Sequence, residues 1–380
     1  MTILNFVPRI VVGDDALDYL STINGDEIFI VTDKFISESP MIDAITEKMD
    51  NKNLTIFSDI VPDPPIDNIT KGIKVLEEHQ SNVVIAIGGG SALDAAKGII
   101  YFAAQSGVGR SRDEITFIAI PTTSGTGSEV TDFSVITDSD KGVKYPLVTT
   151  DILPDVALLY TGFVMNLPKQ QTADTGIDVL THAIEAYVSN NANSISDAFA
   201  EKAIKLVFEY LLKAYSEGPT NATAREQMHL ASTMAGLAFN MVSLGINHSI
   251  AHAMGGKFHL VHGRINGILL NSVMLYNSGL ICEERNAHQK TMQRYAEIAE
   301  FVGVKIKDPK YAILQLNKKI IDLLTRLEMP KTFTEAGIKP ELIKESMAEV
   351  AIAALQDRCT PTNPRIPTQE HIEAIIKTVI

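Results

Sequence analysis

The chain has 380 residues, of which 45% are hydrophobic and 21% are charged, and its formal net charge is -13. These proportions are ordinary for a globular protein, and the length suggests two or more domains. The negative charge argues against nucleic acid or an anionic membrane surface as the main partner, because both bind basic patches. We therefore expect small-molecule chemistry.

The N-terminal residues Met1–Phe6 lack a basic stretch followed by an apolar segment, and no apolar run reaches the ~18 residues of a membrane span. Only two cysteines, Cys282 and Cys359, are present, which is too few for a disulfide framework. We expect a cytoplasmic protein in which both cysteines are thiols.

The first part of the chain alternates short apolar runs with helical patterns. Three of the runs are Glu27–Val31, Asn82–Ile87 and Ile115–Ile120. Runs this uniformly apolar are typical of strands that are buried on both faces of a parallel sheet. The sequence therefore predicts an α/β domain with a parallel sheet over residues 1–166.

Strand signals stop after Leu167-Pro168. Apolar residues then recur at helical spacing in several long segments, including Ser196–Ala214, Ala224–Phe239, Lys290–Val302 and Tyr311–Leu327. We predict an all-helical second domain over residues 167–380.

A glycine-rich turn, Gly88-Gly89-Gly90-Ser91, follows the second apolar run and opens a helical segment. Glycines let backbone amides approach a ligand closely, and a helix N-terminus favours an anionic group such as a pyrophosphate. A second polar loop over residues 121–129 follows the third run, and its hydroxyls suit ribose or phosphate contacts. Neither loop has the Gly-x-Gly-x-x-Gly order or the ATPase phosphate-loop order. We predict a dinucleotide site of a different kind.

An earlier apolar run ends at Asp33. A carboxylate at the C-terminal end of a strand can accept hydrogen bonds from an adenosine ribose and would repel a 2′-phosphate, which favours NAD over NADP. An aspartate there can equally be a helix cap.

Four of the nine histidines, His248, His252, His259 and His262, lie close together, and His182 follows Asp178 at helical spacing. Side chains four residues apart share a helix face, so Asp178 and His182 can bind one ion together, as can His248 and His252. In one unbroken helix His248 and His262 would lie roughly 21 Å apart, whereas the ligands of one ion are ~4 Å apart. We expect the first helix to stop at Gly255-Gly256 so that the chain can fold back. Zinc, iron or another first-row ion would suit such a site.

In combination, these motifs resemble those of the iron-dependent (group III) alcohol dehydrogenases. The resemblance rests on Gly88–Ser91 with Asp94 and Lys97, the loop 121–129, Thr175–Tyr187, His248 to Gly263, and Cys359 with Asn363-Pro364-Arg365. Within the family, the chain is most similar to the 1-propanol dehydrogenases of propanediol-utilisation microcompartments, through Asp140–Leu147, Ala200–Ala203 and Gly255–Leu260.

The resemblance implies a dehydroquinate synthase-like fold that uses NAD and Fe²⁺, with Zn²⁺ as the alternative ion. The implied metal ligands are Asp178, His182, His248 and His262. His252 would lie beside the metal and relay a proton, and Phe239 and Cys359 would line the substrate pocket. The residues that the resemblance assigns to NAD are Asp33, Gly89, Gly90, Ser91, Asp94, Thr122, Thr123, Thr126 and Lys144.

The implied activity is NAD(H)-dependent interconversion of a short primary alcohol, 1-propanol or similar, and its aldehyde. A 1,3-propanediol, lactaldehyde or glycerol-type dehydrogenase and a dehydroquinate synthase-like lyase are the alternatives with the same fold. From another class, the chain could be a catalytically silent nucleotide-binding or assembly protein, but such a protein needs neither metal ligands nor a proton relay. We expect a homodimer or a higher homo-oligomer. If the protein enters a microcompartment, shell or cargo proteins are further partners.

Overall fold

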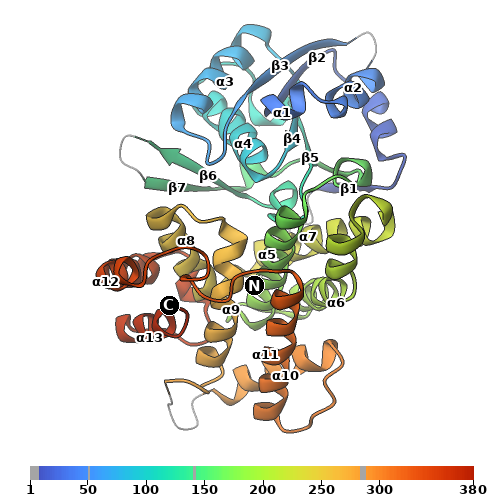
Figure 1. The fold of residues 1–380 in the computed structure, drawn as a ribbon. Coiled ribbons are helices and arrows are strands. Elements are labelled where there is room, and N and C mark those ends of the chain that lie inside the picture. The colour runs from blue at the N-terminus through green and yellow to red at the C-terminus, as the bar shows by residue number, and fades with distance from the viewer. Residues whose placement is uncertain (1–7, 50–51, 140–142, 283–287) are drawn as a thin grey trace. The chain divides into compact units, whose positions relative to one another are not determined.

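The computed structural model describes residues 8–49, 52–139, 143–282 and 288–380. The chain divides into two compact units, Met1–Asn166 and Leu167–Ile380. The first is built on a parallel sheet, and the described part of the second contains helices and no strands (Figure 1). The predicted fold class is confirmed.

Within the described residues, the sheet of the first unit has six strands in the order β1-β8-β5-β4-β2-β3, and every neighbouring pair is parallel. The three predicted strands correspond to β2, β4 and β5, which lie next to one another inside the sheet and are almost wholly buried. The strands are β1 (Arg9–Val12), β2 (Glu27–Asp33), β3 (Asn53–Ile60), β4 (Val83–Gly88), β5 (Thr116–Pro121) and β8 (Val156–Leu159).

Alternate side chains of the central strands enter two different cores. Phe29 and Val31 of β2 pack with α3 (Ile66–His79) and α4 (Gly90–Gln105) on one face of the sheet. Ile28 and Ile30 pack on the other face, with α2 (Pro40–Thr46) and the short 3-10 helix Ala16–Thr22. This alternation is the period of two that a β-strand imposes on its side chains. It explains why the central strands are apolar throughout.

An antiparallel hairpin of β6 (Phe133–Asp138) and β7 (Val143–Val148) forms a separate two-stranded sheet. The hairpin has no clear signal in the sequence, because β6 mixes polar and apolar residues and β7 contains a proline. Of the stretch Asp140–Leu147 that carried the narrower resemblance, residues 140–142 lie outside the described residues and the rest lies in β7.

The four predicted helical segments of the second unit correspond to α6, α7, α10 and α11, with ends that agree to within one turn. The helices are α5 (Lys169–Val188), α6 (Ser194–Glu217), α7 (Ala222–Val242), α8 (Ile246–Phe258), α9 (His262–Asn277), α10 (Gln289–Phe301), α11 (Pro309–Arg326), α12 (Pro340–Gln356) and α13 (Gln369–Lys377).

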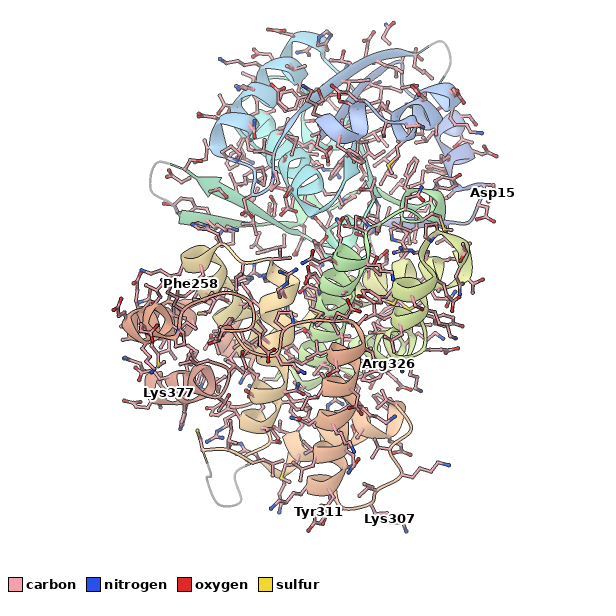
Figure 2. The ribbon with its side chains drawn as sticks, in the orientation of Figure 1. Asp15, Phe258, Lys307, Tyr311, Arg326 and Lys377 are labelled. Atoms are coloured by element: carbon pink, nitrogen blue, oxygen red, sulfur yellow. The ribbon has the colours of Figure 1, made fainter. Side chains whose placement is uncertain are left out.

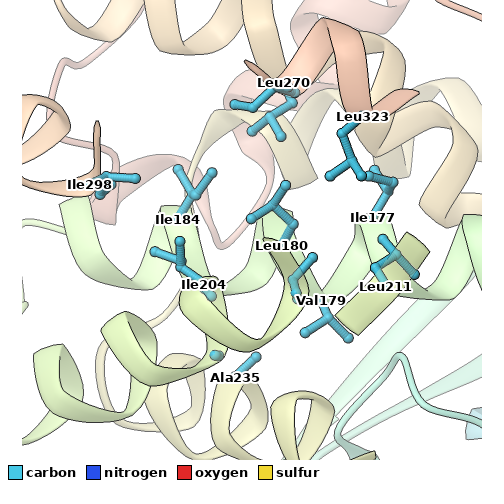
Figure 3. Packing of buried hydrophobic residues seen from close by; sticks show 14 of the residues in the cluster. Ile177, Val179, Leu180, Ile184, Ile204, Leu211, Ala235, Leu270, Ile298 and Leu323 are labelled. Atoms are coloured by element: carbon cyan, nitrogen blue, oxygen red, sulfur yellow. The ribbon is translucent and has the colours of Figure 1, made fainter. Parts of the chain in front are cut away.

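Helix α5 is a core element of this unit. Its residues Ile177, Leu180 and Ile184 lie among apolar side chains of α6, α7, α9, α10 and α11 (Figure 3). Because neighbours cover α5, its polar residues at helical spacing, Asp178 and His182 among them, are buried too. Burial of charged groups costs free energy unless they are paired or bind a metal, so this polar stripe marks a functional feature.

Helix α8 does not stop where the sequence analysis expected. It continues through Gly255 and Gly256 to Phe258, which Figure 2 labels. The helix ends because His259 adopts the left-handed conformation, with φ 54°, and its amide donates to the Gly255 carbonyl (3.0 Å). The reversal therefore takes place over residues 259–261. A glycine pair permits a helix end but does not require one.

Among the described residues, no single helix is long and apolar enough to cross a membrane; α7 and α8, which are bent by 104° at their junction, pass that test only when taken together.

Candidate metal centre and cofactor loops

Asp178, His182, His248 and His262 converge in the second unit. Each offers one ligand atom, and the four atoms lie within 4.8 Å of one another. The first three side chains are buried, whereas the His262 side chain is 41% exposed. One carboxylate and three imidazoles is a donor set that suits a divalent first-row ion such as Fe²⁺ or Zn²⁺. The residues present therefore fit the metal that the sequence motifs imply.

Three helices position the cluster. Asp178 and His182 lie one turn apart on α5, His248 lies in the first turn of α8, and His262 is the first residue of α9. Helix α9 approaches α5 very closely. The measure of this approach is that a Cβ atom placed on Gly263 would lie only 2.0 Å from the Asp174 carbonyl oxygen. Only glycine allows this approach, which brings the His262 Nε2 to 3.8 Å from the Asp178 Oδ1.

The imidazole rings of the cluster pack on one another. The rings of His182 and His248 are stacked, with centroids 4.5 Å apart and an interplanar angle of 18°. The other side of His182 stacks on Phe239 of α7, at a centroid distance of 4.6 Å. Phe239, a predicted pocket residue, thus provides an aromatic surface directly beside a candidate ligand.

Glu185 contacts His248 on the ring nitrogen that does not face the cluster. Its Oε2 lies 2.6 Å from the His248 Nδ1, and its Oε1 accepts a hydrogen bond from the Asn247 amide (2.7 Å). For the polypeptide by itself, burial raises the pKa of Glu185 to about 8 and lowers the pKa of His248 well below its ordinary value. The imidazole is thus kept in the neutral form that binds metals. A carboxylate behind a ligating histidine also selects its tautomer and orientation.

Asn266 lies among the ligand atoms. Its Nδ2 donates to the Asp178 Oδ1 (2.6 Å) and lies 3.1 Å from the Nε2 atoms of both His248 and His262. Its Oδ1 in turn accepts a hydrogen bond from the Asn247 Nδ2 (2.9 Å), which fixes the orientation of the amide. Asn266 was not among the predicted site residues, although its position four residues after His262 was an available signal.

His252 is placed beside the cluster and outside it. Its ring stacks on His262 with centroids 5.4 Å apart, and its Nδ1 lies 2.8 Å from the Asp357 Oδ2. Burial opposes ionisation of Asp357, but the hydrogen bond and charge of His252, together with the Cys359 amide, lower the pKa of Asp357 to about 2. The carboxylate therefore stays ionised and holds the imidazole. Asp357 is a second residue that the sequence analysis missed.

Cys359 and Asn363-Pro364-Arg365 follow α12. The Cys359 thiol is buried, and its burial and the nearby Asp357 raise the pKa of the thiol well above its ordinary value. Asn363 accepts a hydrogen bond from the first amide of α8 (3.1 Å). Arg365 donates to the carbonyls of Tyr276 (2.8 Å) and Cys282 (2.6 Å). Apart from Cys359, this motif therefore supports the helices that carry the cluster.

The predicted cofactor residues of the first unit follow neighbouring strands of the sheet. The chain leaves β2 towards β3 and returns to β4 on the other side of β2, and the helices that follow β2 and β4 pack on opposite faces. In open α/β sheets, ligands bind at such a topological switch point. Asp33 ends β2 and Gly88 ends β4. They therefore lie where a dinucleotide is expected.

Asp33 caps α1 (Lys34–Ser37), because its Oδ1 accepts a hydrogen bond from the Ile36 amide (2.9 Å). A Cβ atom on Gly88 would lie 3.9 Å from the other carboxylate oxygen and 2.6 Å from the Cβ of Ala92. Gly88 also has φ 153°, so its position requires glycine on two grounds. The helix-cap reading of Asp33 from the sequence is confirmed, and its contact with an adenosine ribose stays a prediction.

The two predicted loops contact each other at the start of α4. Gly89 is the residue before the helix, and a Cβ atom on it would lie 3.5 Å from Thr123. A Cβ atom on Gly90 would lie 3.0 Å from Thr126. The Thr122 amide donates to the Gly88 carbonyl (2.9 Å). The threonines are therefore beside the helix N-terminus that we expect to bind the pyrophosphate.

Asp94 and Lys97 hold the second loop in place. The Asp94 carboxylate accepts hydrogen bonds from the Ser128 hydroxyl (2.8 Å) and the Val135 amide (3.0 Å). The fully buried Lys97 ammonium donates to the carbonyls of Ser128 (2.6 Å) and Phe133 (2.8 Å). These contacts support an anchoring role for Asp94, in addition to the contact with pyrophosphate that remains a prediction.

Lys144 forms an exposed ion pair with Asp63, whose Oδ1 lies 2.6 Å from the lysine Nζ. The Asp63 amide also donates to the Ser91 hydroxyl (3.3 Å). Asp63 therefore connects two predicted cofactor residues that are far apart in the sequence, and the sequence analysis did not identify it.

Comparison with known proteins agrees with these features. Residues 8–161 match the family described as iron-containing alcohol dehydrogenase, and residues 172–380 match the Fe-containing alcohol dehydrogenase family, C-terminal. The chain is 40% identical over 383 residues to the 1-propanol dehydrogenase PduQ of Salmonella typhimurium, with 100% of both chains covered. It is 41% identical over 378 residues to the 1-propanol dehydrogenase PduQ of Citrobacter freundii, with 98% of both covered. The crystal structure of a 1,3-propanediol oxidoreductase has a TM-score of 0.89 and 30% identity, with 100% of both chains covered. The chain therefore belongs to the iron-containing alcohol dehydrogenase family.

Proposed function

We propose that this chain interconverts 1-propanol and propanal, or a closely similar short primary alcohol and its aldehyde, with NAD(H) as the hydride carrier. Membership of the family makes the chain a metal-dependent alcohol dehydrogenase that uses NAD and Fe²⁺. The preferred alcohol and the roles of the individual residues are the proposal. The observation that carries these roles is the convergence of Asp178, His182, His248 and His262, with His252 next to them.

Asp178, His182, His248 and His262 would hold the ion. When bound, the ion supplies Lewis-acid polarisation of the substrate oxygen. Glu185 orients the His248 ring and Asn266 orients the Asp178 carboxylate by the hydrogen bonds described above. Their effect is to hold the donor atoms ready, which lowers the cost of organising the site when it is loaded.

His252 passes the proton between the substrate oxygen and solvent in this proposal. Its side chain is 36% exposed, so the ring can exchange protons with water. Asp357 accepts the hydrogen bond at Nδ1, which leaves Nε2 as the atom that takes and returns the proton. General acid–base help of this kind is typically worth ~10²–10⁴-fold in rate.

Phe239 and Cys359 are the residues that we assign to the substrate pocket. Phe239 stacks on His182 and so offers an aromatic surface to the carbon chain of a small alcohol. Cys359 is buried, and its amide is bound to the same Asp357 that holds His252. A surface of this kind favours a short apolar substituent over the hydroxyls of glycerol, because a buried hydroxyl without a partner costs free energy.

The decisive experiment measures initial rates with anaerobically purified, iron-loaded protein, NADH and a panel of aldehydes and ketones. We expect the highest kcat/KM with propanal and lower values with 3-hydroxypropanal, lactaldehyde and dihydroxyacetone. The His252→Ala variant should keep its iron and lose turnover. Binding of NADH without turnover of any substrate would instead identify the silent nucleotide-binding alternative. A preference for a hydroxylated substrate would favour one of the other dehydrogenases.

We further propose a cytoplasmic homo-oligomer that is encapsulated in a bacterial microcompartment, which is what the resemblance noted in the sequence implies. Co-fractionation of the native protein with microcompartment shells tests encapsulation, and analytical ultracentrifugation measures the oligomeric state. Recovery of all the protein in the shell-free fraction would contradict encapsulation.

A further inference from the structure

A second group of side chains with three different donor atoms lies next to the four-residue cluster. His252, Asp357 and Cys359 each offer one ligand atom, and these atoms lie within 4.8 Å of one another. None of the three belongs to the cluster of Asp178, His182, His248 and His262. The group combines a nitrogen, an oxygen and a sulfur donor, whereas the first cluster has no sulfur.

Hydrogen bonds hold the group together. The His252 Nδ1 lies 2.8 Å from the Asp357 Oδ2, and the Cys359 amide donates to the Asp357 Oδ1 (2.8 Å). Ser249 donates to the same Oδ1 (3.3 Å). Asp357 is thus the central member, fixed by contacts to α8 on one side and to its own chain segment on the other.

The exposure of the group is uneven. Cys359 is 5% exposed and the Asp357 side chain 15%, whereas the His252 side chain is 36% exposed. An ion could therefore enter from the His252 side and keep a water molecule as a further ligand. Three protein ligands and one open position is an arrangement that zinc adopts readily.

We infer that His252, Asp357 and Cys359 form a second metal site, selective for thiophilic divalent ions such as Zn²⁺, and that the ion bound there inhibits the enzyme. Carboxylate and thiolate together balance the charge of a divalent cation, which reduces the cost of placing it in a largely buried position. In a zinc site, ligand atoms at the usual bond lengths are roughly 3.5 Å apart, so shifts of about 1 Å in the side chains suffice.

Binding requires two changes of protonation and no redox step. The Cys359 S–H bond breaks, its proton passes to solvent, and the sulfur forms the bond to the ion. The neutral His252 imidazole moves its proton from Nδ1 to Nε2, and the Nδ1 lone pair becomes a ligand. The hydrogen bond between His252 and Asp357 is lost. Inhibition follows because Nε2 then carries the proton that it would have to accept, and this consequence rests on the relay role proposed above.

Cobalt provides a direct test, because thiolate-bound Co²⁺ has a near-ultraviolet charge-transfer band that nitrogen and oxygen ligands do not produce. We would load the first cluster with one equivalent of Co²⁺ per chain and then add a second equivalent. The band should appear with the second equivalent. It should be lost in Cys359→Ser and retained in Cys282→Ser, which removes the other thiol of the chain.

The Asp357→Asn variant keeps the size of the central member and removes its charge, so the second equivalent should bind more weakly while circular dichroism stays unchanged. A wild-type protein that binds the second equivalent without the band would overturn the site, as would a band that survives Cys359→Ser. With the iron-loaded enzyme, added Zn²⁺ should lower kcat and a chelator should restore it. The cobalt spectrum needs no turnover, so an inactive protein that shows the band would contradict the proposed substrate but not this site.

Discussion

The pairing of Glu185 with His248 illustrates how a buried residue outside the candidate coordination set can control a ligand. Glu185 is buried on α5, and it contacts both the ring and the backbone of His248 together with the Asn247 amide. A glutamine of the same shape would keep the volume but could not release a proton when the metal binds, so it could not provide the negative charge that favours metal binding by the opposite ring nitrogen.

We therefore predict that Glu185→Gln lowers the affinity for the metal by about 10- to 100-fold and leaves the fold intact. Competition with a chromophoric chelator measures this affinity without reference to turnover. Glu297→Gln is the matched control, because Glu297 bonds to the Tyr187 hydroxyl (2.9 Å) and not to the cluster. Equal affinities of wild type and Glu185→Gln would show that Glu185 only fills space.

Asp33 combines two functions that a substitution can separate. Its Oδ1 caps α1, and asparagine caps a helix about as well as aspartate does. We predict that Asp33→Asn keeps the stability of the wild type but raises kcat/KM with NADPH relative to NADH, because the negative charge that repels a 2′-phosphate is gone. Steady-state kinetics with both cofactors check the ratio. A wild-type enzyme that prefers NADPH would contradict the assignment.

The contact of α9 with α5 depends on one glycine, and α8 offers a contrasting position. A Cβ atom on Gly263 would meet backbone of Asp174 at 2.0 Å, whereas a Cβ atom on Gly256 would meet nothing within 4 Å. Backbone cannot rotate away as a side chain can. The two glycines therefore have different physical roles, although both lie within helices.

From this contrast we predict that Gly263→Ala forces α9 away from α5, separates His262 from Asp178 and abolishes high-affinity metal binding. Gly256→Ala should instead keep the metal and stabilise the protein by roughly 0.5–1 kcal/mol, since alanine is the better helix former. Metal content after dialysis and urea unfolding measure the two effects. Retention of the full metal content in Gly263→Ala would contradict this prediction, because it would show that metal binding does not depend on the close contact of α9 with α5.

The stability of the protein towards acid depends on histidines that are buried far from solvent. His229 of α7 is 2% exposed, and burial lowers its pKa from 6.5 to about 4. Between these two pH values the unfolded chain binds a proton that the folded chain does not. Stability is therefore lost as the pH falls through this range, by roughly 3 kcal/mol once the range has been crossed.

We predict that His229→Gln flattens the decrease of the unfolding free energy between pH 6.5 and about pH 4, the range that the unfolded and folded pKa values define. Urea unfolding at a series of pH values measures the slope for wild type and variant. His79→Gln, at an exposed position of α3, is the control and should keep the wild-type slope. The same slope in His229→Gln and wild type would assign the acid sensitivity to other groups.

Much of the architecture is readable from the order of the amino acids. The uniformly apolar runs at Glu27–Val31 and Asn82–Ile87 indicate strands covered on both faces, and they are β2 and β4. The residue types of the site are readable too, because a glycine turn before a helix and a carboxylate one turn from an imidazole are local patterns. Edge strand β1 and the β6–β7 hairpin lack such a pattern, since strands that are not covered on both faces need no continuous apolar run.

The tertiary structure alone decides which of these side chains act together. His252 follows His248 by one turn on α8, yet it lies outside the four-residue cluster. Its hydrogen-bond partner is Asp357, the residue that follows α12. Glu185 of α5 contacts His248 of α8, and Asn266 of α9 donates a hydrogen bond to Asp178 of α5. Local preferences act over about one helical turn, whereas these partners meet only when burial of the α5 core brings distant segments together. The amino-acid order therefore reveals the chemistry that is available, and packing selects the atoms that use it.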